Sequence, residues 1–161
     1  HVAIPVDHRS FDAVWAEDIV PFRVLARELG GVMPAHVIFE NIDARPAGFS
    51  PFWLQDVLRG RLGFQGVIFS DDLTMEGASV AGGIVARAEA AHSAGCDMVL
   101  VCNRPDMAVD LLDNWHPQLS AGSCKRIVAL RPRPGTAPAD PDTLAGWAPY
   151  RTARDGVLAL A

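Results

Sequence analysis

Apolar residues recur at two different periods along residues 11–114. From Phe11 to Leu29 they return every three or four positions, which is the spacing of one helix face. Ser10 suits the N-cap of this helix, and Gly30-Gly31 can end it in a left-handed turn. Pro21 lies inside the pattern, so a kink or two shorter helices is also consistent with it. The apolar run Gly31–Phe39 then predicts a buried strand whose C-terminal end frays at Pro34.

The same alternation of helix and strand occurs twice more. Ser50-Pro51 provides a helix N-cap followed by proline at the first helical position, and Gly63 can close that helix. The run Gly66–Ser70 predicts a second strand, almost wholly apolar, as parallel strands covered on both faces tend to be. The third round comprises an Ala-rich helix over residues 83–94, a strand over residues 98–102 and a helix over residues 106–114. This spacing is typical of right-handed βαβ units, so the sequence predicts an α/β fold with a parallel sheet.

The remainder of the chain is less patterned. Residues 131–142 are rich in proline, and we expect a loop that closes the core region there. The last twenty residues predict a short terminal helix.

Composition narrows the class of protein. With 161 residues, of which 50% are hydrophobic, the chain can bury a substantial core. A net charge of −5 argues against nucleic acid or an anionic membrane as the main partner. No apolar run approaches the roughly 18–20 residues that span a bilayer. The three cysteines match no zinc or CxxC spacing, so we expect a reducing, cytoplasmic setting without a disulfide.

Candidate chemistry lies where the predicted strands end, because parallel α/β folds gather functional groups at the carboxyl ends of their strands. The residues there are His36, Asp71-Asp72 and Asn103-Arg104. The two aspartates are the strongest candidates, because an unpaired carboxylate in an apolar site is costly. One of them could instead cap the next helix, with the other solvated. His36 could equally be a core histidine bonded to a backbone carbonyl, and the Asn-Arg pair suits a surface turn.

The segments after the second and third strands also distinguish two kinds of site. They are DDLTMEG and NRPDM, and neither forms the glycine-rich loop that binds phosphate. The first places two negative charges where an anion would lie. A carboxylate nucleophile, or a carboxylate that stabilises an oxocarbenium-like centre, fits better and indicates glycoside chemistry.

Longer blocks of sequence carry a family resemblance. PAHVIF at residues 34–39, GVIFSDDLTM at 66–75 and AGCDMVLVCN at 94–103 closely resemble the family 3 glycoside hydrolases. Within that family they are most similar to the bacterial β-N-acetylglucosaminidases of peptidoglycan recycling. The resemblance extends from residue 1 to about residue 114. It implies a (β/α)8 TIM barrel, a retaining mechanism, and neither a metal nor another cofactor.

The resemblance also implies roles for individual residues. Asp71, the first aspartate of the SDDL block, matches the nucleophile that forms a covalent glycosyl-enzyme. Asp72 is then its structural neighbour. His1 matches the histidine of a His-Asp acid/base dyad, and an imidazole with an unperturbed pKa of about 6.5 suits that role. Met75 and His36 match positions near the sugar pocket, although Met75 taken alone would suit the core.

The activity implied by the resemblance is that of an exo-β-N-acetylglucosaminidase. Such an enzyme removes terminal N-acetylglucosamine from muropeptides that carry 1,6-anhydro-N-acetylmuramic acid, or from chitobiose-like substrates. We expect a cytoplasmic monomer of cell-wall recycling, linked to cell division and, in some bacteria, to β-lactamase induction and antibiotic resistance. A β-glucosidase of the same family and a non-catalytic sugar-binding barrel are the alternatives.

The implied barrel changes the interpretation of length. A closed (β/α)8 barrel needs about 250 residues, whereas the sequence predicts three core strands. We therefore expect residues 1–161 to be the C-terminal part of a single catalytic barrel, about its last three βα units, with the N-terminal strands outside this sequence.

Overall fold

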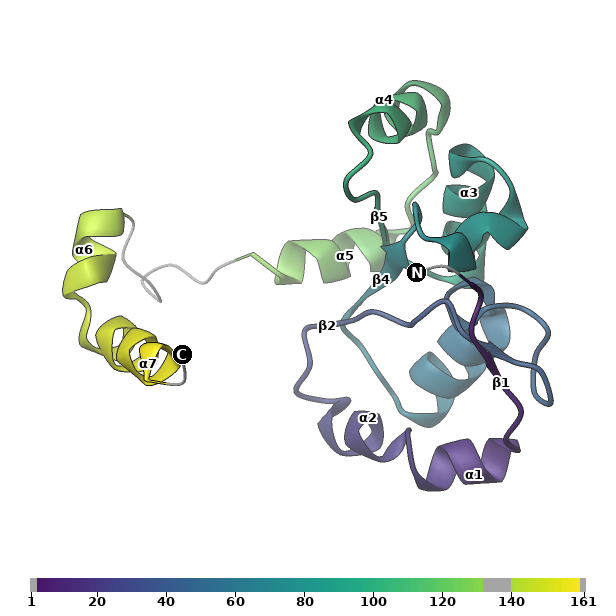
Figure 1. Cartoon of the computed structure of the whole chain (residues 1–161), viewed down its shortest axis with the longest axis horizontal. Helices are drawn as coiled ribbons and strands as arrows, with labels where there is room; N and C mark the ends of the chain where they lie inside the picture. The colour runs from purple at the N-terminus through teal and green to yellow at the C-terminus, as the bar shows by residue number, and fades with distance from the viewer. Residues whose placement is uncertain (1–2, 132–139, 160–161) are drawn as a thin grey trace. The chain divides into compact units, whose positions relative to one another are not determined.

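The computed structural model describes residues 3–131 and 140–159 and divides into two compact units (Figure 1). The first, here called the main unit, comprises residues 1–130, and the second, the C-terminal unit, comprises residues 131–161. All predicted site residues belong to the main unit. No helix among the described residues is long and apolar enough to cross a membrane.

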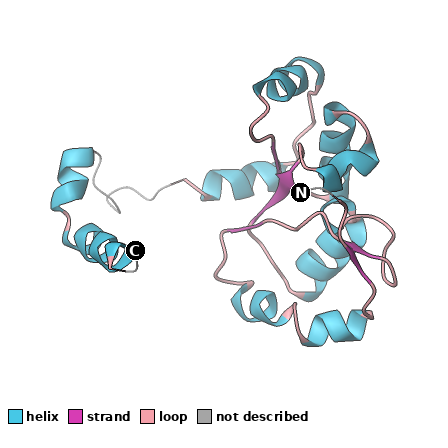
Figure 2. Ribbon diagram, viewed as in Figure 1, coloured by secondary structure: helices cyan, strands magenta, loops and turns pink. Residues whose placement is uncertain are grey.

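The strands of the main unit form two parallel sheets (Figure 2). β2 (Gly31–Val32), β4 (Val67–Asp72) and β5 (Met98–Leu100) form one sheet, with β4 in the centre. β1 (Val6–Asp7) pairs with β3 (Ile38–Phe39) in the other. The predicted α/β class with parallel pairing is confirmed.

One predicted strand is wrong in extent. The run Gly31–Phe39 contains two short strands, β2 and β3, which belong to different sheets. Pro34 lies between them and has no N–H to donate to a neighbouring strand, so pairing stops before it.

The first predicted helix is two helices, α1 (Phe11–Ala16) and α2 (Val20–Leu25), as Pro21 allows. The Oγ of Ser10 accepts a hydrogen bond from the backbone N–H of Ala13 at 3.3 Å, which confirms the N-cap. The left-handed turn expected at Gly30-Gly31 is absent, since the described glycines with positive φ are Gly63, Gly82 and Gly95. The helix ends earlier, at Leu25, and Gly31 pairs in β2.

The second and third rounds agree closely with the prediction. After the short 3-10 helix η1 (Ala47–Phe49), the π-helix η2 (Phe52–Arg61) begins beside Ser50, whose Oγ accepts from the N–H of Trp53 at 3.1 Å. Gly63, with φ of +67°, follows the end of η2. The elements that follow are the 3-10 helix η3 (Glu76–Ala81), α3 (Ile84–Ala94) and α4 (Pro105–Asn114).

Three further helices complete the described chain. α5 (Ala121–Ala129) was not expected, and its N-terminus is capped by Ser120, which accepts from the N–H of Ser123 at 3.0 Å. The C-terminal unit contains α6 (Pro141–Gly146) and α7 (Ala148–Leu158), so the predicted terminal helix is present. Most of the expected proline-rich loop, residues 132–139, lies outside the described residues.

The core of the main unit surrounds β4. Val67 and Ile68 are fully buried within this strand, which explains its continuous apolar sequence. The main cluster joins β4 to η2 and α3, and includes Leu54, Phe64, Leu73, Ala88 and Ala91. The cluster packs around β4, and the aspartate pair lies at the carboxyl end of this strand.

Candidate active site

Asp71 and Asp72 are the last two residues of β4. The strand was predicted to end at Ser70, but it continues because Asp72 still pairs with Leu100 of β5. The pairing with β5 shifts register between Phe69 and Asp72, and the two carboxylates have different surroundings. A direct contact also joins them, since the backbone N–H of Asp72 donates to Oδ1 of Asp71 at 2.8 Å.

The carboxylate of Asp72 is occupied by structural hydrogen bonds. Oδ1 accepts from the N–H of Thr74 at 2.9 Å and from the N–H of Cys102 at 3.0 Å, and Oδ2 accepts from the Thr74 hydroxyl at 2.7 Å. Burial raises the pKa of Asp72, but the hydrogen bonds from Thr74 and Cys102 outweigh it, so the net shift is downward. Asp72 therefore connects the ends of β4 and β5 and stabilises the turn after β4. It does not cap a helix.

Asp71 faces a cavity of about 180 Å³. Among the described residues, Oδ1 alone of its two oxygens has a hydrogen-bond partner. The residues around the cavity come from the segment before β1, the β2–β3 connection, the end of β4 and the segment after it: Ala3, Pro5, Ala35, His36, Val37, Asp71, Met75 and Gly77. Three predicted site residues, Asp71, His36 and Met75, thus lie around one space. His1 lies outside the described residues.

His36 reaches this cavity from the β2–β3 connection. Only 2% of it is exposed, and its Nε2 donates to the backbone carbonyl of Asp72 at 3.2 Å. Its ring packs against Phe49, with 5.0 Å between ring centroids. Burial lowers the pKa of His36, while the negative charge of Asp71 opposes this shift. The bond expected of a core histidine is therefore present, and the same residue lines the cavity.

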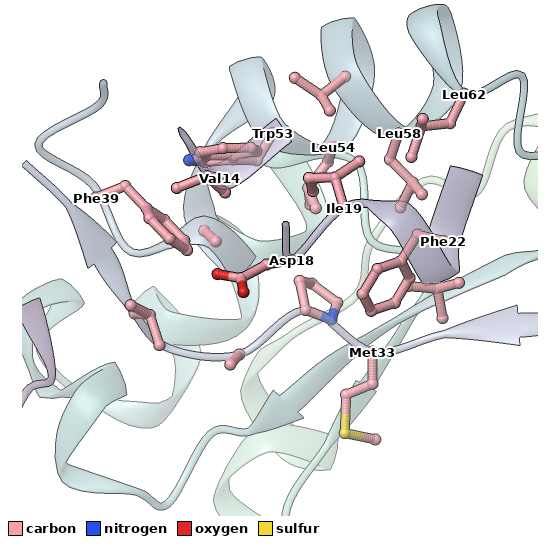
Figure 3. Close-up of a pocket in the computed structure, with 16 residues that line it drawn as sticks. Val14, Asp18, Ile19, Phe22, Met33, Phe39, Trp53, Leu54, Leu58 and Leu62 are labelled. Atoms are coloured by element: carbon pink, nitrogen blue, oxygen red, sulfur yellow. The ribbon is translucent and has the colours of Figure 1, made fainter. Parts of the chain in front are cut away.

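A second cavity is larger, about 260 Å³, and differs in character (Figure 3). Residues of η2, of the α1–α2 region and of the segment 32–39 line it, and most of these side chains are aliphatic or aromatic. Asp18, the charged residue in the wall, pairs with Arg9. A space without converging polar groups offers nothing for glycoside chemistry, so the candidate site is the smaller cavity beside Asp71.

The structure also contains a buried charge cluster around Asp97, directly before β5, which the sequence pattern did not predict. Its side chain is 1% exposed and accepts hydrogen bonds from Arg59 at 2.9 Å and from Arg126 at 3.0 Å. A charged residue directly before an apolar strand was the available signal.

Within residues 3–131 and 140–159, no cluster of His, Cys, Asp or Glu side chains is arranged to hold a metal ion.

A parallel α/β unit with a carboxylate at the end of its central strand is consistent with the resemblance noted above. Residues 1–128 match the glycosyl hydrolase family 3 N terminal domain, so the chain belongs to this family and has its TIM-barrel-like α/β fold. The predicted family is confirmed.

Individual relatives are similar over nearly the whole chain. A beta-hexosaminidase of Aromatoleum aromaticum is 65% identical over 161 residues, which cover 99% of this chain and 45% of the relative. One of Bordetella parapertussis is 55% identical over 155 residues, 96% of this chain and 43% of the relative. The chain therefore spans less than half the length of these curated relatives.

Solved structures agree with this assignment. The native NagZ of Neisseria gonorrhoeae superposes with a TM-score of 0.82 and 40% identity, over 100% of this chain and 45% of that one. NagZ from the same organism in complex with N-trifluoroacetyl-D-glucosamine matches 80% of this chain and 36% of its own, with a TM-score of 0.72 and 47% identity.

Proposed function

We propose that the protein carrying this chain is a retaining exo-β-N-acetylglucosaminidase with Asp71 as its nucleophile. The observation that supports this is the environment of Asp71. Its carboxylate lies at the carboxyl end of the central strand, faces a cavity, and keeps one oxygen without a partner among the described residues. A nucleophilic carboxylate needs a fixed orientation and a free oxygen.

The proposed reaction has two displacement steps. The free oxygen of Asp71 attacks the anomeric carbon, the bond from that carbon to the leaving oxygen breaks, and the leaving oxygen takes a proton from the acid/base. Water then attacks the glycosyl-enzyme while the acid/base removes its proton, which releases the sugar and the free carboxylate. We assign the acid/base role to His1 from the family resemblance.

The proposed substrate is a muropeptide with terminal N-acetylglucosamine on 1,6-anhydro-N-acetylmuramic acid, cleaved by a cytoplasmic monomer of cell-wall recycling. Two findings support the sugar class. The curated relatives above are named beta-hexosaminidase, and the gonococcal NagZ structure contains N-trifluoroacetyl-D-glucosamine. The net charge of −5 does not favour nucleic acid or an anionic membrane as a partner.

The test is Asp71→Asn, in a protein of the relatives' length that carries this chain. Asparagine keeps the acceptor for the N–H of Asp72 and removes the nucleophile, so turnover of an aryl N-acetyl-β-glucosaminide should fall by at least about 10³-fold with the fold intact. Asp106→Asn is the matched control, because its carboxylate is exposed and pairs with Arg104. Turnover retained in Asp71→Asn would exclude Asp71 as the nucleophile.

Two comparisons separate the alternatives. A β-glucosidase would have a higher kcat/KM on an aryl glucoside than on the N-acetylglucosaminide. A sugar-binding barrel without catalysis would bind the sugar, but mass spectrometry would detect no covalent adduct on Asp71 with a slowly hydrolysed glycoside.

For His1, a neutralising substitution should slow substrates with poor leaving groups most, because these need the proton. Equal losses across leaving groups would exclude an acid role.

A further inference from the structure

His36 forms a long-range connection to the end of β4. It is separated from Asp72 by 36 residues along the chain, yet its Nε2 lies 3.2 Å from the Asp72 carbonyl oxygen. A carbonyl oxygen accepts and cannot donate, so Nε2 must carry the hydrogen. In the neutral ring, Nδ1 is then the unprotonated nitrogen, and it is buried without a partner among the described residues.

The ring of His36 is held by tight packing on several sides. A Cβ added to Gly77 would lie 2.6 Å from the Cβ of His36, and one added to Gly48 would lie 3.6 Å from its Nδ1. Phe49 covers another side. The position of Nε2 is therefore determined by η1 and η3 as well as by the residue's own loop.

The bond from His36 acts on the residue that orients the proposed nucleophile. The N–H of Asp72 donates to Oδ1 of Asp71 at 2.8 Å, and the carbonyl of the same residue accepts from His36. This carbonyl also accepts from the N–H of Met75 at 3.1 Å, so the turn that carries Met75 depends on the same oxygen. Loss of the imidazole donor would leave the Asp72 carbonyl with the N–H of Met75 as its one donor among the described residues.

The Asp72 side chain is anchored separately. Its carboxylate binds Thr74 and the N–H of Cys102, so the connection between β4 and β5 does not need His36. A change at His36 should therefore alter the direction of the Asp71 carboxylate more than it alters the sheet.

We propose that His36 is a positioning residue for catalysis, a neutral Nε2–H donor that holds the Asp72 backbone and thereby aims the carboxylate of Asp71 into the cavity. This inference rests on the proposed role of Asp71 as nucleophile. A small misplacement of a reacting group costs up to about 100-fold in rate, so His36→Leu should lower kcat by about 10- to 100-fold. KM should change by less than about threefold, because the substitution removes a bond to the Asp72 backbone and leaves the Asp71 carboxylate in place.

The experiment compares His36→Leu with His36→Gln in a protein of the relatives' length, using an aryl N-acetyl-β-glucosaminide whose leaving group departs fast. The amide nitrogen of glutamine can replace the Nε2–H donor, whereas leucine fills similar space without one. The pre-steady-state burst has an amplitude that counts intact sites and a rate constant that reports formation of the glycosyl-enzyme. A positioning role lowers the rate constant in the leucine variant and restores it to within about threefold of the wild type in the glutamine variant.

Each other outcome has a definite meaning. A lower amplitude with an unchanged rate constant would show that His36 only supports the fold, and would overturn the inference. Equal rate constants for the leucine and glutamine variants would also overturn it. If His36→Leu does not fold, His36→Asn replaces it, since its amide is too short to reach the Asp72 carbonyl. If mass spectrometry finds no adduct on Asp71 in the wild-type enzyme, the proposed function fails independently of His36.

Discussion

Replacing Asp97 with asparagine removes one buried negative charge from a cluster of donors. The side chain is 1% exposed and accepts hydrogen bonds from Arg59, Arg126, the Ser123 hydroxyl and the backbone N–H of Ile68. Burial raises the pKa of Asp97, but the hydrogen bonds from Arg126 and Ser123 lower it by more. The net shift of the pKa is downward, so the folded state keeps the carboxylate ionised. This single side chain joins η2, β4 and α5.

The expected loss of stability follows from the burial of the partners. Breaking a buried ion pair by neutralising one partner costs about 3–5 kcal/mol. Arg59 and Arg126 keep 15% and 27% of their side-chain surface exposed, so water partly compensates for the lost charge. We therefore expect the lower end, about 3 kcal/mol. At roughly 2–4 °C per kcal/mol for a protein of more than about 150 residues, the Tm should fall by roughly 6–12 °C.

Thermal unfolding followed by circular dichroism measures this change. Asp106→Asn is the control, because the Arg104–Asp106 pair has a short 2.6 Å contact but side chains that are 55% and 63% exposed. Exposed pairs contribute less than about 1 kcal/mol. Equal decreases in Tm for Asp97→Asn and Asp106→Asn would show that burial does not increase the contribution of the Asp97 ion pairs to the free energy of unfolding.

Two further predictions concern the same unit. Burial holds the pKa of His36 below its ordinary value, so below about pH 6.5 the unfolded chain binds a proton that the folded chain excludes. The free energy of unfolding should therefore decrease as pH falls from about 7 towards the lower folded pKa, and it should decrease less steeply in His36→Gln. Denaturant titrations at several pH values measure it, and the same slope against pH for the wild type and His36→Gln would refute this. Gly66→Ala should cost about 1–3 kcal/mol, because its Cβ would lie 2.5 Å from the carbonyl oxygen of Gly30. Gly156→Ala meets open space and should not destabilise; equal midpoints for the two alanine variants would contradict the packing argument.

The elements that the sequence predicted best have strong local signals. The helix expected over residues 83–94 is α3 (Ile84–Ala94), and Gly95 follows it with φ of +122°. The N-caps at Ser10 and Ser50 and the turn at Gly63 are also present. These features depend on residues within one helical turn of each other, so a sequence pattern contains the information needed to predict them.

The errors occur where distant pairing decides the structure. Residues 31–39 have one continuous apolar pattern, but β2 pairs with β4 and β3 pairs with β1, so the run is divided between two sheets. α5 was missed because its inner face is polar. Ser123 and Arg126 donate hydrogen bonds to Asp97. Only the tertiary fold brings Asp97 next to α5.

The candidate site shows the same division. Asp71 was found because it directly follows an apolar strand and lies in a block that resembles the family. The sequence allowed a bond from His36 to a backbone carbonyl but did not indicate that Asp72 would provide it. It also did not indicate that Thr74 and Cys102 would occupy the Asp72 carboxylate.

By itself, the sequence determined the parallel α/β class, the family and the residue most suited to be a nucleophile. These follow from short-range periodicity and from contiguous blocks of residues. Only the tertiary structure decided that His36 and Cys102 hold Asp72, and which strand each apolar segment joins. It also decided where Asp97 finds its cations. Such contacts join residues about 30 or more positions apart, and chain folding alone brings them within hydrogen-bond distance.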